Sequence, residues 1–189
     1  GELQEELEHL ESQYGYQQLS YLSPDAVAEL TSAQGFYGAL LDDGCRHLHP
    51  LKYAVGLARA AAHAGVRIYE HSRAQPAPNG QSGEVKTAQG HVKSQHVVLG
   101  CNAYLGKLIP RLACNIMPIN NFVIATEPLP SHLLPRINRD NLSMSDTLFV
   151  INYWKLSEDG RMLFGGGENY SSRFPRDIKA FVRPHMLNI

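Results

Sequence analysis

The chain has 189 residues, of which 43% are hydrophobic, enough for one large or two small folded domains. Its 17 Lys and Arg nearly balance its 18 Asp and Glu, and the formal net charge is -1. Without a basic cluster, nucleic acid and anionic membranes are excluded as main partners. No apolar run approaches the roughly 20 residues of a membrane span, and the start lacks the pattern of a signal peptide. We therefore expect a soluble, cytoplasmic protein.

The three cysteines are odd in number and widely spaced: Cys45, Cys101 and Cys114. This spacing indicates neither a disulfide framework nor a CxxC zinc site. We interpret all three as buried thiols.

The N-terminal third predicts two helices and a strand. Residues 2–14 are acidic and carry leucines at i, i+4 and i+7, which is typical of an amphipathic surface helix. Ser23 and Pro24 suit the N-cap and first position of a second helix. The aromatic stretch 36–41 predicts a strand, followed by an Asp-Asp-Gly turn at 42–44.

The stretch 44–70 predicts an extended entry, a helix, a turn and a strand. Pro50 suits the first position of the helix, small and apolar residues recur at helical spacing, and Gly65 can end it in the left-handed conformation. The run 66–70 is of β type. Helix, glycine and strand in this order are half of a βαβ crossover, so a parallel strand is predicted here.

The middle of the chain predicts a loop, a hairpin and a buried strand. Residues 73–83 are rich in Pro, Gly, Asn and Gln, as in a surface loop or hairpin tip. The segments 84–87 and 91–93 flank Gln-Gly and predict a β-hairpin, and the apolar run 96–100 predicts a buried strand.

The C-terminal part predicts an antiparallel sheet and a final helix. The segments 113–127 and 147–155 are β-rich, and 161–165 is placed to pair with the latter across the turn 157–160. Residues 176–188 have a helical pattern that continues to the last residue, and Gly1 stands where an initiator methionine would be. We expect this sequence to be a piece of a longer protein.

Two histidines, His47 and His49, would lie on the same side of an extended strand, and such a pair can bind a metal in small β-barrels. The next acidic residue is Glu70, after an alanine-rich helix, so a complete ligand set is missing. We therefore predict no metal and treat a histidine-metal enzyme as the less favoured alternative.

Two further patterns leave alternatives open. The glycine-rich run 164–168 matches neither GxGxxG nor GxxxxGK; it is typical of a strand end or bulge, or of close backbone approach to a flat ligand. On a strand, Tyr153 and Lys155 share a face and Trp154 lies opposite. This phenol and ammonium could line a polar pocket, or the segment could be a hairpin edge with a snorkelling lysine.

An ordered series of segments covering nearly the whole chain resembles the FAD-dependent amine and amino-acid oxidases, the superfamily of D-amino-acid, glycine and sarcosine oxidases. The series comprises residues 37–38, 47–53, 65–68, 87–90, 97–99 and 102–105. Further segments resemble the branch of this family that acts on gamma-glutamylputrescine: residues 117–120, 125–129, 149–153 and 163–168.

This resemblance implies an FAD-dependent oxidation of an amine C–N bond, with molecular oxygen as acceptor and aldehyde, ammonia and hydrogen peroxide as products. It implies an α+β fold: an antiparallel substrate-binding sheet with flanking helices, plus part of a Rossmann-type FAD-binding domain. The corresponding ranges are 1–49, 50–108 and 109–189, of which the middle one belongs to the FAD domain.

The resemblance also assigns candidate site residues. Tyr153, Trp154 and Lys155 are candidates for the substrate side, and the C-terminal sheet would cover the flavin. His49, Ala74, Asn102 and Ala103 would lie near the cofactor. No catalytic residue is assigned.

The sequence departs from the family at Arg46, where close relatives tend to have glycine, and by two missing segments. It lacks the GxGxxG motif that opens the family's first helix, and it lacks the glycine-rich segment near the family's C-terminus. We therefore expect these 189 residues alone to bind FAD weakly or not at all, to be inactive, and to self-associate through apolar surface on the helix at 51–63. The alternative from another class is a cofactor-free binding or interaction module.

Overall fold

The computed structural model describes residues 1–76, 83–170 and 173–189. Its contacts divide the chain into two compact units, which we call unit 1 (Gly1–His49 and Asn120–Ile189) and unit 2 (Pro50–Ile119). The divisions fall after His49 and after Ile119, whereas the sequence boundaries are placed after residues 49 and 108. The ranges that flank the middle segment thus build one unit together.

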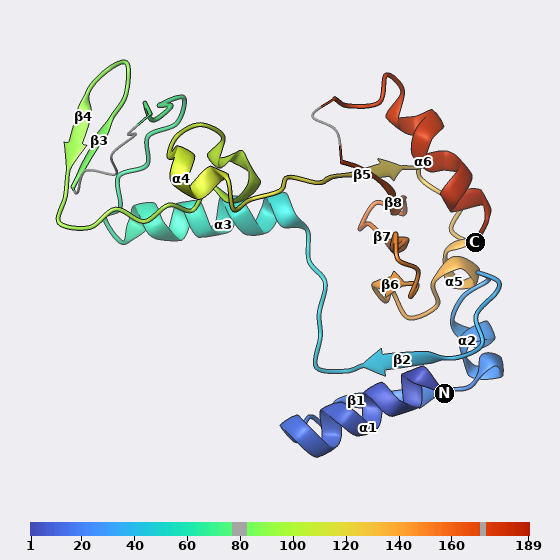
Figure 1. Cartoon of the computed structure of the whole chain (residues 1–189). Helices are drawn as coiled ribbons and strands as arrows, with labels where there is room; N and C mark the ends of the chain where they lie inside the picture. The colour runs from blue at the N-terminus through green and yellow to red at the C-terminus, as the bar shows by residue number, and fades with distance from the viewer. Residues whose placement is uncertain (77–82, 171–172) are drawn as a thin grey trace. The chain divides into compact units, whose positions relative to one another are not determined.

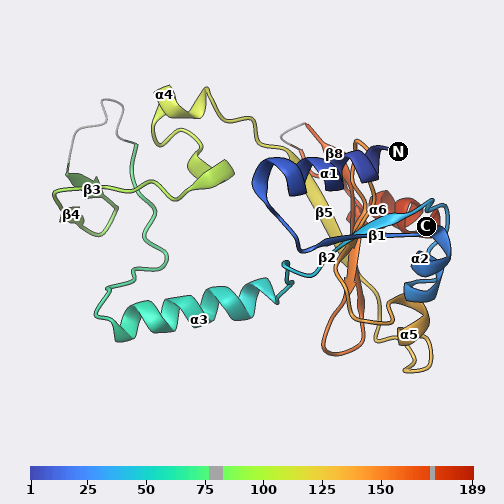
Figure 2. The same ribbon diagram turned by 90° about the horizontal axis from the view of Figure 1, so that it is seen from below.

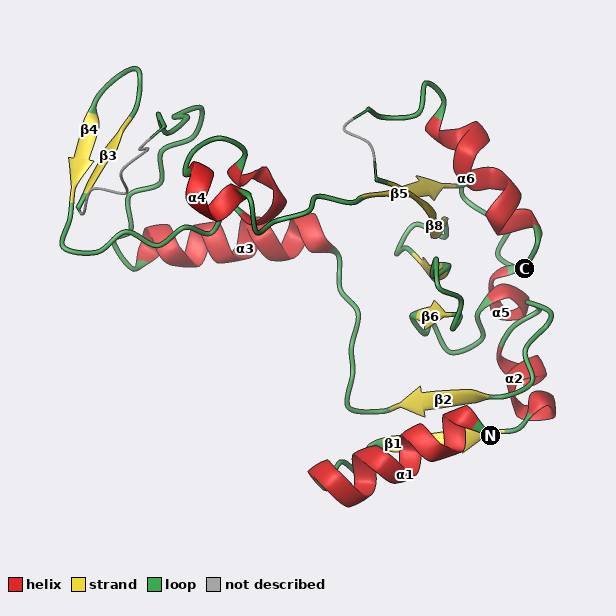
Figure 3. Ribbon diagram, in the orientation of Figure 1, coloured by secondary structure: helices red, strands yellow, loops and turns green. Residues whose placement is uncertain are grey.

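Helices and strands alternate along the chain in the mixed pattern of an α+β protein (Figure 3). The helices are α1 (Glu2–Tyr14), α2 (Pro24–Leu30), α3 (Pro50–His63), the 3-10 helix η1 (Asn102–Leu105), α4 (Pro110–Ala113), α5 (Leu134–Ile137) and α6 (Ile178–Leu187). The strands are β1 (Leu19–Leu22), β2 (Ala39–Asp42), β3 (Glu84–Lys86), β4 (His91–Lys93), β5 (Asn120–Ala125), β6 (Met144–Ser145), β7 (Tyr153–Leu156) and β8 (Met162–Asn169).

Unit 1 is organised around an antiparallel sheet with the strand order β5-β8-β7-β6. The predicted hairpin is confirmed, because β7 pairs with β8 so that Trp154 lies opposite Phe164. The strands are shorter than the predicted 113–127 and 147–155, since β5 begins at Asn120 and β7 at Tyr153. α6 packs against β5 and β8 (Figures 1 and 2), and its N-cap Asp177 accepts a hydrogen bond from the Ala180 amide at 2.9 Å.

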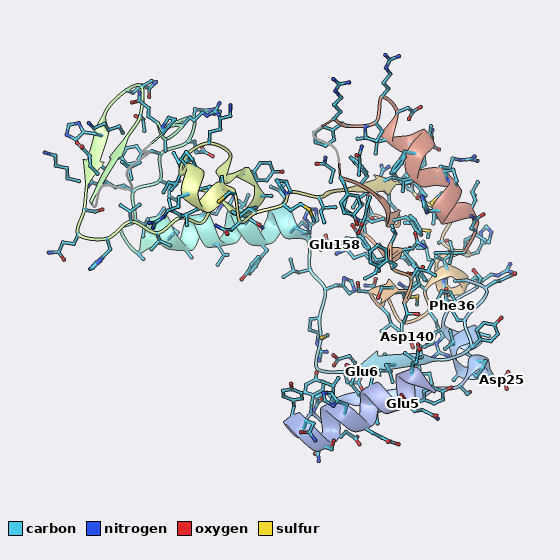
Figure 4. The ribbon with its side chains drawn as sticks, in the orientation of Figure 1. Glu5, Glu6, Asp25, Phe36, Asp140 and Glu158 are labelled. Carbon is cyan, nitrogen blue, oxygen red and sulfur yellow. The ribbon has the colours of Figure 1, made fainter. Side chains whose placement is uncertain are left out.

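The core of unit 1 lies between α6 and one face of this sheet. Its buried residues are Phe122, Trp154, Phe164 and Val182, and Phe164 and Val182 are fully buried. Trp154 stacks on Phe164 with ring centroids 6.3 Å apart. The ring centroid of Phe36, which is labelled in Figure 4, lies 5.9 Å from that of Trp154. Phe36 therefore joins the N-terminal part of the chain to the sheet.

The N-terminal elements of unit 1 follow the prediction closely. α1 has the predicted bounds, and α2 begins at Pro24 with the Ser23 hydroxyl accepting from the Ala26 amide at 3.3 Å. β1 and β2 form an antiparallel pair, so the strand expected at 36–41 begins later, at Ala39.

Unit 2 contains α3, the two-stranded sheet of β3 and β4, η1 and α4. The predicted helix and hairpin are confirmed, and α3 ends where Gly65 takes a φ of 86°. Part of the predicted 73–83 loop lies outside the described residues.

Two predicted strands of unit 2 are wrong. Residues 66–70 and 96–100 have no ladder partners in the described structure, and Val98, expected to be buried, is 92% exposed. A strand needs hydrogen bonds to a neighbour, and the described part of unit 2 holds no third or fourth strand beside these segments. Apolar composition alone is therefore not enough to make these segments strands. The Rossmann-type arrangement stays a prediction.

The cysteines are free, but the expectation of buried thiols is wrong. Cys45 and Cys114 are exposed and Cys101 is partly exposed. Among the described helices, none combines the length and apolar character needed to cross a membrane.

Candidate functional site

The face of the sheet opposite the core carries the predicted substrate-side residues. Strand alternation and register place Tyr153 and Lys155 of β7, Leu163 and Gly165 of β8, and Val123 of β5 on this face, which we call the open face. Val123 is 54% exposed, whereas its neighbour Phe122 points into the core at 4%. The open face thus presents apolar surface next to a phenol and an ammonium.

Tyr153 bridges three strands of the open face. It lies opposite Gly165 on β8, and a Cβ at position 165 would overlap the Tyr153 ring, so the ring lies against the glycine backbone. The hydroxyl then donates to Asn121 Oδ1 on β5 at 2.5 Å. Partial burial raises the pKa of Tyr153, which keeps the phenol neutral.

The glycine run therefore serves close packing by the protein's own side chains. Gly165 accommodates Tyr153, a Cβ at Gly166 would lie 2.5 Å from Asn152 Oδ1, and one at Gly167 would lie 2.6 Å from the Phe181 ring. Gly167 also has a φ of 75°, which disfavours other residues. These contacts favour the strand interpretation of the run over approach to a flat ligand.

Lys155 is held by the segment that precedes α3. Its Nζ donates to the Leu48 carbonyl at 2.6 Å. One residue earlier, His47 Nε2 lies 2.6 Å from the Asn141 carbonyl and, because a carbonyl only accepts, donates to it. Leu48 and His47 thus each connect this segment to the part of unit 1 that follows β5.

Trp154 lies on the opposite side of β7. It is 3% exposed and belongs to the core, where it contacts Phe36 and Phe164. The structure gives this residue a packing role, so we leave Trp154 out of the proposed substrate side.

The histidine pair does not form a strand-borne metal site in this structure. His47 and His49 lie in an irregular segment between β2 and α3. In the parts of the chain that the structure describes, no three His, Cys, Asp or Glu residues are grouped closely enough to hold a metal ion.

A side-chain cluster at the end of β2 was not predicted from the sequence. Asp42 accepts hydrogen bonds from the Cys45 thiol at 3.0 Å, the Tyr16 hydroxyl at 2.6 Å and the Gly44 amide at 2.9 Å. The bonds from Cys45 and Tyr16 lower the pKa of Asp42, and the same carboxylate raises the pKa of Tyr16 to about 12 and that of Cys45. The only sequence signal was the Asp-Asp-Gly turn.

The Asp42 cluster borders a pocket of about 750 Å3 in unit 1. Charged side chains of both signs line it, namely Asp42, Asp43, Arg46 and Asp140, together with the imidazole of His47 (Asp140 is labelled in Figure 4). Arg46 and Asp140 each bond to a neighbouring residue. Arg46 donates to the Asp43 carbonyl at 2.5 Å, and Arg139 forms an ion pair with Asp140 at 2.9 Å. Asp42, Arg46, His47 and Asp140 of the pocket wall thus each bond to another group of the chain.

The residues expected near the cofactor lie in both units. His49 is the exposed last residue of the first segment of unit 1. Ala74, Asn102 and Ala103 belong to unit 2, where Asn102 begins η1 with a φ of 46°. Asn tolerates this left-handed conformation better than most residues do.

The open face has the chemistry that a flavin ring requires of a binding surface. The ring is flat and largely apolar with polar edges, and the face combines exposed Val123 with the polar groups of Asn121, Tyr153 and Lys155. These residues fit such a group.

Comparison with known proteins identifies the class. The family model for FAD dependent oxidoreductases, DAO, matches residues 1–189. The chain therefore belongs to the DAO family of FAD-dependent oxidoreductases, and the resemblance found in its sequence is confirmed.

Individual relatives are similar over nearly the whole chain. The probable oxidoreductase OrdL of Rhizobium meliloti (strain 1021) is 36% identical over 184 residues, which are 97% of this chain and 42% of the relative. The gamma-glutamylputrescine oxidoreductase of Escherichia coli (strain K12) is 37% identical over 186 residues, 98% of this chain and 43% of the relative. The chain thus spans less than half the length of these relatives.

Proposed function

We propose that this chain forms the substrate-binding part, with a portion of the FAD-binding part, of an oxidase that acts on an amine C–N bond. The observation that carries the proposal is the placement of Tyr153 and Lys155 together on the open face of a sheet in a DAO-family chain. The substrate proposed is gamma-glutamylputrescine or a similar amine, because a relative with 37% identity is named for that compound.

The proposed net reaction converts amine, water and molecular oxygen into aldehyde, ammonia and hydrogen peroxide. FAD, when bound, supplies the electron acceptor for this oxidation. The residues of this chain bind and orient the amine. The Lys155 ammonium disfavours a second positive charge nearby, so it favours the neutral form of the amine, which has a free electron pair on nitrogen.

His49, Ala74, Asn102 and Ala103 are proposed to lie near FAD, and the middle range 50–108 is proposed to be part of a Rossmann-type domain. The support is the family resemblance of these segments and the match of the family model across them.

The test is peroxide release by the whole FAD-loaded protein with gamma-glutamylputrescine, compared with sarcosine and D-alanine. We expect the highest kcat/KM with gamma-glutamylputrescine. Tyr153→Phe should raise KM about tenfold, as expected for losing a hydrogen bond worth about 1.4 kcal/mol. Lys155→Met should move the pH profile of kcat to higher pH, because the bound amine then keeps its proton more readily. Lys179→Met, an exposed lysine on α6, is the matched control and should leave KM unchanged.

Two results would contradict the proposal. Absence of peroxide with all three compounds would reject amine oxidation. Peroxide release with a normal KM in Tyr153→Phe and an unshifted pH profile in Lys155→Met would reject the open face as the substrate side.

A further inference from the structure

Asn121 determines how the Tyr153 phenol can interact with a ligand. The Tyr153 side chain starts on β7, its ring crosses β8 against Gly165, and its hydroxyl donates to Asn121 Oδ1 on β5 at 2.5 Å. The phenol is thereby held at both its ring and its hydroxyl. Because the side chain is already held in place, it loses less conformational entropy when a ligand binds.

The direction of this hydrogen bond restricts the chemistry of the phenol. A neutral phenol has one proton and two acceptor lone pairs. The phenol donates this one proton in its hydrogen bond to the amide oxygen of Asn121. The phenol oxygen is then left as an acceptor, and the ligand group that matches it is a donor such as an amine N–H.

We propose that Asn121 is a positioning residue that presents the Tyr153 oxygen as a hydrogen-bond acceptor for an amine N–H of the substrate. This inference rests on the proposed function, since it takes the open face as the substrate side. Asn121 acts through Tyr153 and does not itself contact the substrate. It is exposed on β5, so its replacement costs little packing.

A double-mutant cycle in the whole FAD-loaded protein tests the proposal. Asn121→Ala should raise KM for gamma-glutamylputrescine about fivefold and change kcat less than twofold, because the interaction serves binding. In a Tyr153→Phe background, Asn121→Ala should change KM less than 1.5-fold, since the hydroxyl that it positions is gone. Asn121→Asp keeps an acceptor for the phenol proton and should restore most of the loss.

Binding measured without turnover gives a second readout. In the dithionite-reduced protein under anaerobic conditions, calorimetry should show the same fivefold weakening of gamma-glutamylputrescine binding in Asn121→Ala. Asn115→Ala, which replaces an exposed asparagine in unit 2, should bind normally. Thermal melting of each variant should match the unsubstituted protein and so exclude a folding defect.

The outcomes separate the two proposals. If Tyr153→Phe weakens binding but Asn121→Ala does not, or if their effects multiply in the double variant, the positioning role of Asn121 is wrong and the proposed site stands. If Tyr153→Phe leaves both KM and binding unchanged, the phenol does not contact the substrate and the positioning role of Asn121 is wrong. If Lys155→Met is without effect as well, the open face is not the substrate side, and both proposals fail.

Discussion

Single contacts explain why the residues around the open face have the identities they do. Gly165 is required by the Tyr153 ring, Gly166 by the buried Asn152 amide and Gly167 by Phe181 and a positive φ. Asn152 is itself fixed, because its Nδ2 donates to Asp146 Oδ2 at 2.7 Å. A chain segment that looked suited to a ligand is therefore occupied by the protein's own side chains.

Gly165→Ala should disrupt the open face. The added Cβ overlaps the Tyr153 ring, so the ring must move away from Asn121, and overpacking of this kind costs about 1–3 kcal/mol of unfolding free energy. Denaturant unfolding measures the change. Gly56→Ala is the control: no heavy atom lies within 4 Å of the added Cβ in the interior of α3, so it should stabilise the protein by up to about 1 kcal/mol. Equal effects of the two substitutions would contradict this account.

Residue roles differ in how far the sequence predicts them. Strand alternation separates Trp154 from Tyr153 and Lys155, and the structure has this alternation. The sequence did not show that Trp154 faces a core, because that requires knowing that α6 and Phe36 cover this side of the sheet. Nor did it show the bond to Asn121, which is 32 residues away in the chain.

At the scale of the elements, a hydrogen bond between two ionisable side chains, Tyr16 and Asp42, links the loop after α1 to the end of β2. Tyr16 precedes β1, and its hydroxyl bonds to Asp42 at the end of β2 at 2.6 Å. This bond raises the pKa of Tyr16 from 10.0 to about 12. A raised folded-state pKa adds stability that is fully present below pH 10 and is lost as the pH rises toward 12.

The alkaline stability of the protein should therefore depend on Tyr16. The melting temperature should fall between pH 10 and 12, and Tyr16→Phe should make this fall less steep. Tyr14→Phe is the matched control, because Tyr14 is an exposed tyrosine near the end of α1, and it should keep the original slope. An unchanged slope in Tyr16→Phe would show that the bond to Asp42 does not contribute.

Helices and hairpins were predictable because their determinants are local. α1 and α3 have the predicted bounds, and β3–β4 and β7–β8 are the predicted hairpins. The strands expected at 66–70 and 96–100 depend on partners from elsewhere in the chain. Composition alone therefore could not decide their state.

At the scale of the whole molecule, the exposed apolar surface of α3 favours association between chains. Its polar side is narrow, with Lys52, Gly56, Arg59 and His63 at successive helical turns, and most of the remaining surface is apolar. No residue of α3 is buried, and Leu51 is 68% exposed. Exposed apolar surface of this extent favours association.

The polypeptide of residues 1–189 should therefore self-associate, with α3 contributing to the interface. Leu57→Glu places a charge on the apolar side and should weaken association about tenfold, which sedimentation at increasing concentration measures. His63→Glu adds a negative charge on the polar side and should leave association unchanged. Equal weakening by both substitutions would mean that net charge, and not the apolar side of α3, controls association.

The sequence by itself determined the α+β class, most helices, both hairpins and membership of the FAD-dependent oxidoreductase family. These follow from short-range patterns and from an ordered series of family-specific segments. Only the tertiary structure decided that Trp154 is core, that the glycine run packs against side chains, and that Tyr153 reaches Asn121 across β8. Those facts depend on which strands become neighbours, and strand neighbours are set by contacts between residues distant in the sequence.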